Sequence, residues 1–154
     1  MPDPQRPGPP STDTRFRQYS RIILASAAVL IVTGAVELWM GRLPLGPDGR
    51  FGFWEGNIWS SEQSQRFADP YTFSHTIHGM LFYGFLWLVA RRLPMRYGFI
   101  GALVLEGAWE ILENSPVIIN RYREVTIALG YVGDSVFNSL SDILFAGLGF
   151  LFAW

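Results

Sequence analysis

The chain has 154 residues, of which 49% are hydrophobic and 16% aromatic, and its formal net charge is −1. This length fits a single domain, and the hydrophobic fraction, with a mean hydropathy of +0.20, exceeds what a small soluble core requires. The twelve basic residues are all arginine and form no strongly basic patch, so we expect no nucleic-acid partner. The lack of cysteine excludes disulfides and thiolate metal sites.

Four apolar runs, each long enough to cross a bilayer as a helix, follow a proline-rich polar tail. We expect residues 1–21 to form a disordered cytoplasmic tail, because the first eleven residues hold five prolines and almost nothing apolar. Residues 22–154 would form the membrane domain, with spans at about 22–40, 71–90, 97–114 and 134–154. A polar loop rich in Gly, Pro and Trp joins the first two spans. The sequence therefore predicts an all-α integral membrane protein, a compact bundle of about four transmembrane helices in the lipid bilayer.

Two stretches near the C-terminus are less regular. Residues 117–133 begin apolar but are interrupted by Arg121, Arg123 and Glu124, which favours an interfacial or re-entrant segment over a further span. The final run stops at Trp154 without a polar cap. We therefore expect a chain that is truncated at its C-terminus.

The arginines predict the orientation in the membrane. Seven of them precede the first span or lie between the second and third spans: Arg6, Arg15, Arg17, Arg21, Arg91, Arg92 and Arg96. Positively charged residues collect on the cytoplasmic side of a multi-pass protein. Both termini would then be cytoplasmic.

Polar side chains recur on three of the predicted spans. Asp134, Asn138 and Asp142 would share one helical face, because residues four apart lie one above another. In the predicted orientation, the same outer half of the bilayer receives further polar residues from the second and third spans: His75, His78, Glu110, Glu113 and Asn114. Ionised side chains cost about 2.5 to 3.5 kcal/mol each near the centre of a bilayer, so they should face protein or water.

This cluster has the composition of a metal-binding or catalytic site. His75, His78, Glu110 and Asp142 supply the ligand atoms of a divalent metal such as zinc, manganese or iron, although their spacing matches no established metal signature. Carboxylates without a metal could instead share protons, which makes Glu110, Asp134 and Asp142 the candidate catalytic residues. Arg121 and Arg123 could hold a phosphate. The candidate substrate-binding residues are therefore Arg121, Arg123, Asn114, Asn138 and Ser74.

Each of these residues also has a purely structural interpretation. The two histidines could be a hydrogen-bonded pair at a helix start, Glu106 and Glu110 could pair with arginine, and Asp134 could be only an N-cap. Glu37 and Glu113 could reach interfacial water. Packing and hydrogen bonding between helices would account for a further set: Asn138, Ser139, Ser141, Gly147 and Gly149.

Five motifs taken together resemble a known family: residues 60–65, 71–79, 108–116, 121–123 and 133–142. The set is similar to bacterial inner-membrane proteins grouped as domain of unknown function 2585, also called uncharacterised protein family 0314. The resemblance implies a bacterial inner membrane and brings no assigned activity. Cysteines usual in the first loop are absent, Gln63 stands where asparagine is usual, and Pro70 replaces an aromatic residue. More distantly, the order of His, Glu and Asp/Asn along successive helices is similar to VanZ-like proteins.

Three functions remain open from the sequence. The first is a binding or catalytic site that opens to the outer face, uses a metal or binds phosphate, and acts on an envelope or lipid-linked substrate. The second is an accessory or assembly subunit with a membrane-protein partner, in which polar residues only lock helices together. The third is a small transporter, disfavoured by the short chain and the lack of an internal repeat.

Overall fold

The structure, a computed structural model, describes residues 12–125 and 132–154, and the regular secondary structure of these residues is all helical. Its strand-like pairing is limited to an isolated bridge between Trp54 and Ala68. Five helices follow one another along the described residues: α1 (Thr12–Trp39), α2 (Thr72–Val89), α3 (Met95–Glu113), α4 (Pro116–Val125) and α5 (Val136–Ala153). The predicted all-α class is confirmed.

The helix boundaries differ from the predicted spans at two places. The sequence predicts a disordered tail over residues 1–21, but α1 begins at Thr12, so residues 12–21 are helical. Residues 1–11 lie outside the described residues. Helix α5 begins at Val136, and its N-cap is Ser135, whose side chain accepts a hydrogen bond from the backbone N–H of Asn138 at 3.2 Å. The hydroxyl of Ser135 therefore has the capping role that the structural interpretation gave to Asp134.

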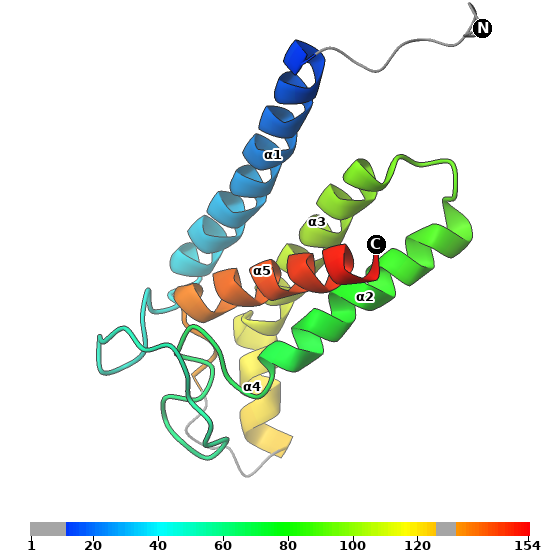
Figure 1. The fold of residues 1–154 in the computed structure, drawn as a ribbon. Helices are drawn as coiled ribbons and strands as arrows, with labels where there is room; N and C mark the ends of the chain where they lie inside the picture. The colour runs from blue at the N-terminus through cyan, green and yellow to red at the C-terminus, as the bar shows by residue number, and fades with distance from the viewer. Residues whose placement is uncertain (1–11, 126–131) are drawn as a thin grey trace, which may run out of the picture.

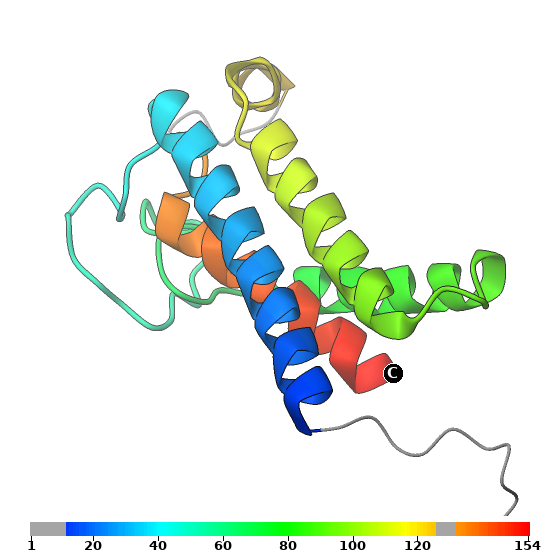
Figure 2. The same cartoon turned by 90° about the horizontal axis from the view of Figure 1, so that it is seen from above.

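Helix α5 lies at the centre of the bundle and packs most extensively on α2, then on α3 and α1 (Figure 1). Helices α2 and α5 run in the same direction, because His75 faces Asp142 and, further along both helices, Tyr83 packs on Phe150. Helix α3 runs against both of them, since its start at Gly98 meets Phe150 and its later Gly107 meets Ile143. Figure 2 shows α1 and α3 side by side over α5, in line with their direct packing.

Small residues set the close crossing of α2 and α5. A methyl group added at Gly79 would collide with the backbone carbonyl of Ala146, and one added at Gly149 would collide with that of Thr76. At Gly147, an added methyl would meet Leu103 of α3 at 3.1 Å. The predicted packing role of Gly147 and Gly149 is confirmed, and Gly79 provides the matching position on α2.

Many of the buried side chains of the bundle are polar, beside an apolar core that includes Ile143 and Phe150, while large apolar residues cover much of its outside. Eight polar or charged side chains within the helices are at most 2% exposed: Thr33, Glu37, Glu106, Glu110, Asn138, Ser139, Ser141 and Asp142. Apolar side chains exposed by 50% or more occur on each long helix, among them Ile23, Leu24, Ile31, Leu81, Phe85, Leu88, Val104, Leu148 and Phe152. Buried polar groups and large exposed apolar side chains are the informative departures from the usual distribution of residues.

Two of the described helices, α1 and α5, are long and apolar enough to cross a membrane by length and composition. Helices α2 and α3 are not among them, so the prediction of four spans is confirmed only as an all-helical fold with two candidate spans.

The loop between α1 and α2 is ordered against the N-terminus of α5. Backbone carbonyls of Arg66 and Phe67 accept hydrogen bonds from Asn138 Nδ2, at 2.9 Å, and from Ser141 Oγ. The guanidinium of Arg66 pairs with Asp48 at 2.7 Å and with Glu62 at 3.0 Å, and its hydrogen bond lowers the pKa of Asp48. This loop therefore forms one wall beside the polar interior.

Candidate functional site

His75 of α2 is the point where the buried carboxylates of two other helices meet. Its Nδ1 atom lies 2.6 Å from Oε1 of Glu106 and 3.3 Å from Oε1 of Glu110, both on α3. On the other side of the ring, Nε2 lies 3.8 Å from Oδ2 of Asp142 on α5. Glu106 and Glu110 are fully buried, Asp142 is 2% exposed and His75 is 7% exposed.

His78 approaches the same cluster from one turn further along α2. Its Nδ1 atom lies 3.2 and 3.3 Å from the two carboxylate oxygens of Glu106. The ring also stands edge-on to Trp109, with 6.1 Å between ring centroids. Glu106 therefore lies between the two histidines, while Glu110 and Asp142 lie nearer to His75.

Several buried carboxylate oxygens of this cluster accept no hydrogen bond from the described residues. Both oxygens of Glu110 and Oδ1 of Asp142 are shielded from solvent and lack a hydrogen-bond partner there. Buried acceptors are normally satisfied, because desolvation of an unpaired polar group is costly. Oxygens left open beside a histidine are what a cation-binding site provides.

Two sets of side chains in the described residues could hold a metal ion. The first set is His75, His78 and Glu106, and the second set is His75, Glu110 and Asp142. Within each set, the ligand atoms lie within 4.8 Å of one another. The direct 2.6 Å contact of Glu106 with His75 Nδ1 is a hydrogen bond, which leaves Nε2 as the ring atom with a free lone pair. We therefore favour the second set, with Glu106 as the carboxylate that orients the ligand histidine; Glu110 Oε1, which lies 3.3 Å from Nδ1, would have to turn toward Nε2 to reach the same ion.

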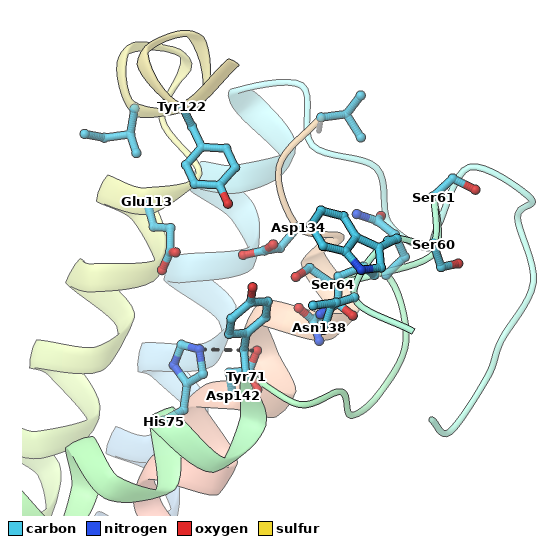
Figure 3. Close-up of a pocket in the computed structure, with 16 residues that line it drawn as sticks. Ser60, Ser61, Ser64, Tyr71, His75, Glu113, Tyr122, Asp134, Asn138 and Asp142 are labelled. Carbon is cyan, nitrogen blue, oxygen red and sulfur yellow. Dashed lines mark ion pairs between the residues drawn. The ribbon is translucent and has the colours of Figure 1, made fainter. Parts of the chain in front are cut away.

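A cavity of about 530 Å³ opens beside this cluster, within the size range of small-molecule sites. His75 and Asp142 lie at its inner end, and Glu113, Asp134 and Asn138 line it further out (Figure 3). Aromatic and hydroxyl side chains complete the described lining, including Trp59, Tyr71, Tyr122, Ser60, Ser61 and Ser64. His75 and Asp142 of the cluster therefore border a space large enough for a small molecule.

Asn114 holds the outer wall of this cavity in place. Its Nδ2 donates to Asp134 Oδ2 at 3.0 Å and to Ser139 Oγ at 3.2 Å, while its Oδ1 accepts from the backbone N–H of Asp134 at 2.6 Å. The end of α3 is thus tied to the residues just before and within α5. The amide of Asn114 is used by the protein itself.

The family model described as "Protein of unknown function (DUF2585)" matches residues 37–154. The chain belongs to this family. A UPF0314 protein of Rhizobium johnstonii is 48% identical over 141 residues, which cover 92% of this chain and 72% of the relative. UPF0314 proteins of Sphingopyxis alaskensis and Paracoccus denitrificans are 50% and 49% identical; the first match covers 84% of this chain and 69% of the relative, the second 90% and 72%. No solved structure is significantly similar to the chain.

Membership of DUF2585 confirms the resemblance drawn from the five sequence motifs. The match begins at Glu37 and includes all five carboxylates and both histidines of the cluster and cavity described above: His75, His78, Glu106, Glu110, Glu113, Asp134 and Asp142. The layout similarity to VanZ-like proteins stays a prediction.

The structure brings part of the predicted site together. His75, Asp134, Asn138 and Asp142 line the cavity, and Glu110 lies buried behind His75. His78 contacts Glu106 and does not line the cavity.

Three predicted substrate-binding residues lie elsewhere. Ser74 is exposed and its hydroxyl donates to the carbonyl of Tyr71 at 2.6 Å. Arg121 and Arg123 belong to α4 but are not part of the described cavity lining. Phosphate binding by Arg121 and Arg123 stays a prediction, and their absence from the described cavity lining gives it no support.

Glu106 was missing from the predicted site residues although it makes the shortest contact to His75. The available signal was its spacing from Glu110 and Glu113, since residues at i, i+4 and i+7 share one helical face. Glu37 was expected to reach interfacial water and is instead fully buried in the bundle, so that expectation was wrong.

Proposed function

We propose that this DUF2585 protein is a multi-pass membrane protein whose buried cluster binds a divalent metal ion through His75, Glu110 and Asp142. The observation that carries the proposal is the meeting of these three side chains from three helices at one buried point, with carboxylate oxygens that accept no hydrogen bond from the described residues. When bound, such an ion would activate a water molecule for hydrolysis of a substrate in the adjoining cavity.

The charge of the cluster supports a cation. His75 is surrounded inside the bundle by three carboxylates, those of Glu106, Glu110 and Asp142. Of these three carboxylates, Glu106 also lies within ion-pair distance of His78. Several buried carboxylates in one place repel one another and lose their hydration, so an uncompensated cluster would be strongly destabilising. A divalent cation would remove both costs, because it neutralises two carboxylates and occupies their open lone pairs.

The remaining side chains have separate roles in this proposal. Glu106 would hold the His75 ring so that Nε2 faces Asp142, as an outer carboxylate does for a ligand histidine. Asp134 would act as the proton acceptor or donor for the substrate, because it lines the cavity and is fixed by Asn114. Asn138 would help to position the substrate. An envelope molecule or a lipid-linked molecule is the substrate class that a cavity at the outer end of the bundle would meet.

The distribution of side chains supports a membrane location for more than the two candidate spans. The apolar outside and polar inside described above suit a lipid surrounding on all long helices. Helices α2 and α3, with 18 and 19 residues, measure roughly 27 to 29 Å at 1.5 Å per residue, close to the thickness of the hydrocarbon core. Helix α4, with ten residues, is only about 15 Å long and too short to cross.

The directions of the helices fit four crossings. Helices α2 and α5 run the same way and α3 runs against them, as expected when α3 is the only crossing between them. Together with the arginine distribution, this supports both described ends of the chain on the cytoplasmic side of a bacterial inner membrane.

Metal analysis of the purified protein tests the proposal. After incubation with zinc or manganese and removal of free ions, the unchanged protein and Glu124→Gln should retain a single ion per chain, while His75→Ala and Asp142→Asn should lose it. Glu124 is the matched control because it is an exposed carboxylate of α4 away from the cluster. When both proteins are compared without metal, Asp142→Asn should be at least as stable to heat in detergent as the unchanged protein, because it removes a buried charge worth up to about 3 kcal/mol of desolvation.

A second function is favoured by a different observation. Hydrogen bonds from the side chains of Asn114, Asn138 and Ser141 connect the end of α3 and the first loop to α5 and the residues just before it. Part of the polar interior is therefore structural. If Asp142→Asn melts earlier and the metal content is unchanged, Asp142 would be holding a charged partner, and an accessory subunit of a membrane complex would be the better function.

A further inference from the structure

The outer part of the cavity is built from four separate elements that present acids and phenols to one space. Tyr71 precedes α2, Glu113 ends α3, Tyr122 belongs to α4 and Asp134 precedes α5. All four line the cavity, and Figure 3 shows the two carboxylates and the two phenol hydroxyls pointing toward its interior. This outer part is distinct from the inner end, where His75 and Asp142 lie.

The described lining of the cavity holds three carboxyl groups and no arginine. Glu113, Asp134 and Asp142 are its carboxylates, and His75 is the sole histidine of the described lining. Residues 126–131, outside the described residues, contain no basic residue in the sequence. At the inner end of the same cavity, Oδ1 of Asp142, a residue 2% exposed, belongs to the lining and accepts no hydrogen bond from the described residues. A phosphate or carboxylate would therefore meet repulsion along this surface.

We infer that the outer part of the cavity binds a primary ammonium group of the substrate, with Glu113 and Asp134 as the charge partners. An ammonium group donates three hydrogen bonds and accepts none, which suits two carboxylates and the phenol oxygens of Tyr71 and Tyr122. The ring of Trp59, which also lines the cavity, adds an apolar, electron-rich face that favours a cation. A neutral sugar would fill the same space but would bring no positive charge to the carboxylates. That the bound molecule is a substrate rests on the proposed function; the binding of an ammonium group does not.

Titration calorimetry with ethylammonium chloride at neutral pH tests the inference on the full chain in detergent. Glucose and inorganic phosphate serve as the neutral and anionic comparison ligands. Each titration is carried out on metal-free protein and on zinc-loaded protein, with the metal content measured separately. Glu113→Gln removes one charge partner, and Glu124→Gln removes a charge outside the cavity.

The expected result is binding of ethylammonium that Glu113→Gln weakens about tenfold or more, as for loss of a charge-assisted hydrogen bond, while Glu124→Gln leaves it unchanged. Metal content should be the same in both variants. If Glu113→Gln does not fold, Tyr71→Phe replaces it and should weaken binding while keeping the ring. Binding of phosphate or glucose with no binding of ethylammonium would overturn the inference, as would ethylammonium binding that neither cavity variant changes. Loss of metal binding with intact ethylammonium binding would instead refute the proposed metal site alone.

Discussion

Nδ1 of His75 lies 2.6 Å from Oε1 of Glu106, and both side chains are buried between α2 and α3. This contact fixes which ring nitrogen is available for a further partner, because Nδ1 is already engaged. Nε2 then faces Asp142 at 3.8 Å on the cavity side of the ring. The contact also links the proposed metal ligand to His78, since the same carboxylate lies 3.2 Å from His78 Nδ1.

We predict that Glu106→Gln weakens metal binding without abolishing it. Glutamine keeps the shape of the side chain but removes the charge that orients His75 and increases its basicity. Loss of such an outer carboxylate typically costs about 10- to 100-fold in metal affinity. Competition titration against a metal-binding dye measures the change. A variant that keeps full affinity while melting earlier would show that Glu106 has only a structural role; Glu124→Gln is the control for loss of one carboxylate.

The crossing of α2 and α5 gives a prediction about stability. Gly79→Ala should destabilise the bundle by about 1 to 3 kcal/mol, because the added methyl meets the backbone of Ala146 and the helices must separate. Thermal unfolding in detergent measures this as a lower melting temperature.

The chain offers two matched controls for that measurement. A methyl group added at Gly84 of α2 or Gly101 of α3 meets no atom within 4 Å in the described residues. Gly84→Ala and Gly101→Ala should therefore be neutral or slightly stabilising, since alanine is the better helix former by up to about 1 kcal/mol. Equal losses in all three variants would contradict the close crossing.

The predicted membrane orientation can be tested with single introduced cysteines, because the chain has no cysteine of its own. In intact cells, an impermeant thiol reagent should label Ser61→Cys in the first loop and leave Arg92→Cys unlabelled until the membrane is opened. Both positions are exposed, so accessibility in the folded protein does not differ between them. Labelling of Arg92→Cys from outside would reverse the orientation, and labelling of neither position would contradict the outer location of the first loop.

The helices and the family could be predicted from the sequence because their signals are local. The apolar runs and their polar interruptions place α2, α3 and α5 within a few residues, since helix formation depends on neighbours along the chain. The same periodicity correctly put Asn138 and Asp142 on one buried face of α5. It failed at Asp134, which lies before the helix starts at Val136 yet still lines the cavity.

The partners of the buried groups were decided only by the tertiary structure. Sequence spacing could not show that Glu106, and not Glu110, bonds most closely to His75, because that choice depends on how α2 and α3 are rotated against each other. It could not show that His78 lies off the cavity or that Glu37 is fully buried. The close approach of α5 to α2 at Gly79 and Gly149, where the absence of a side chain lets the two backbones meet, fixes the inward face of these two helices, and the packing of α1 and α3 on α5 completes the interior.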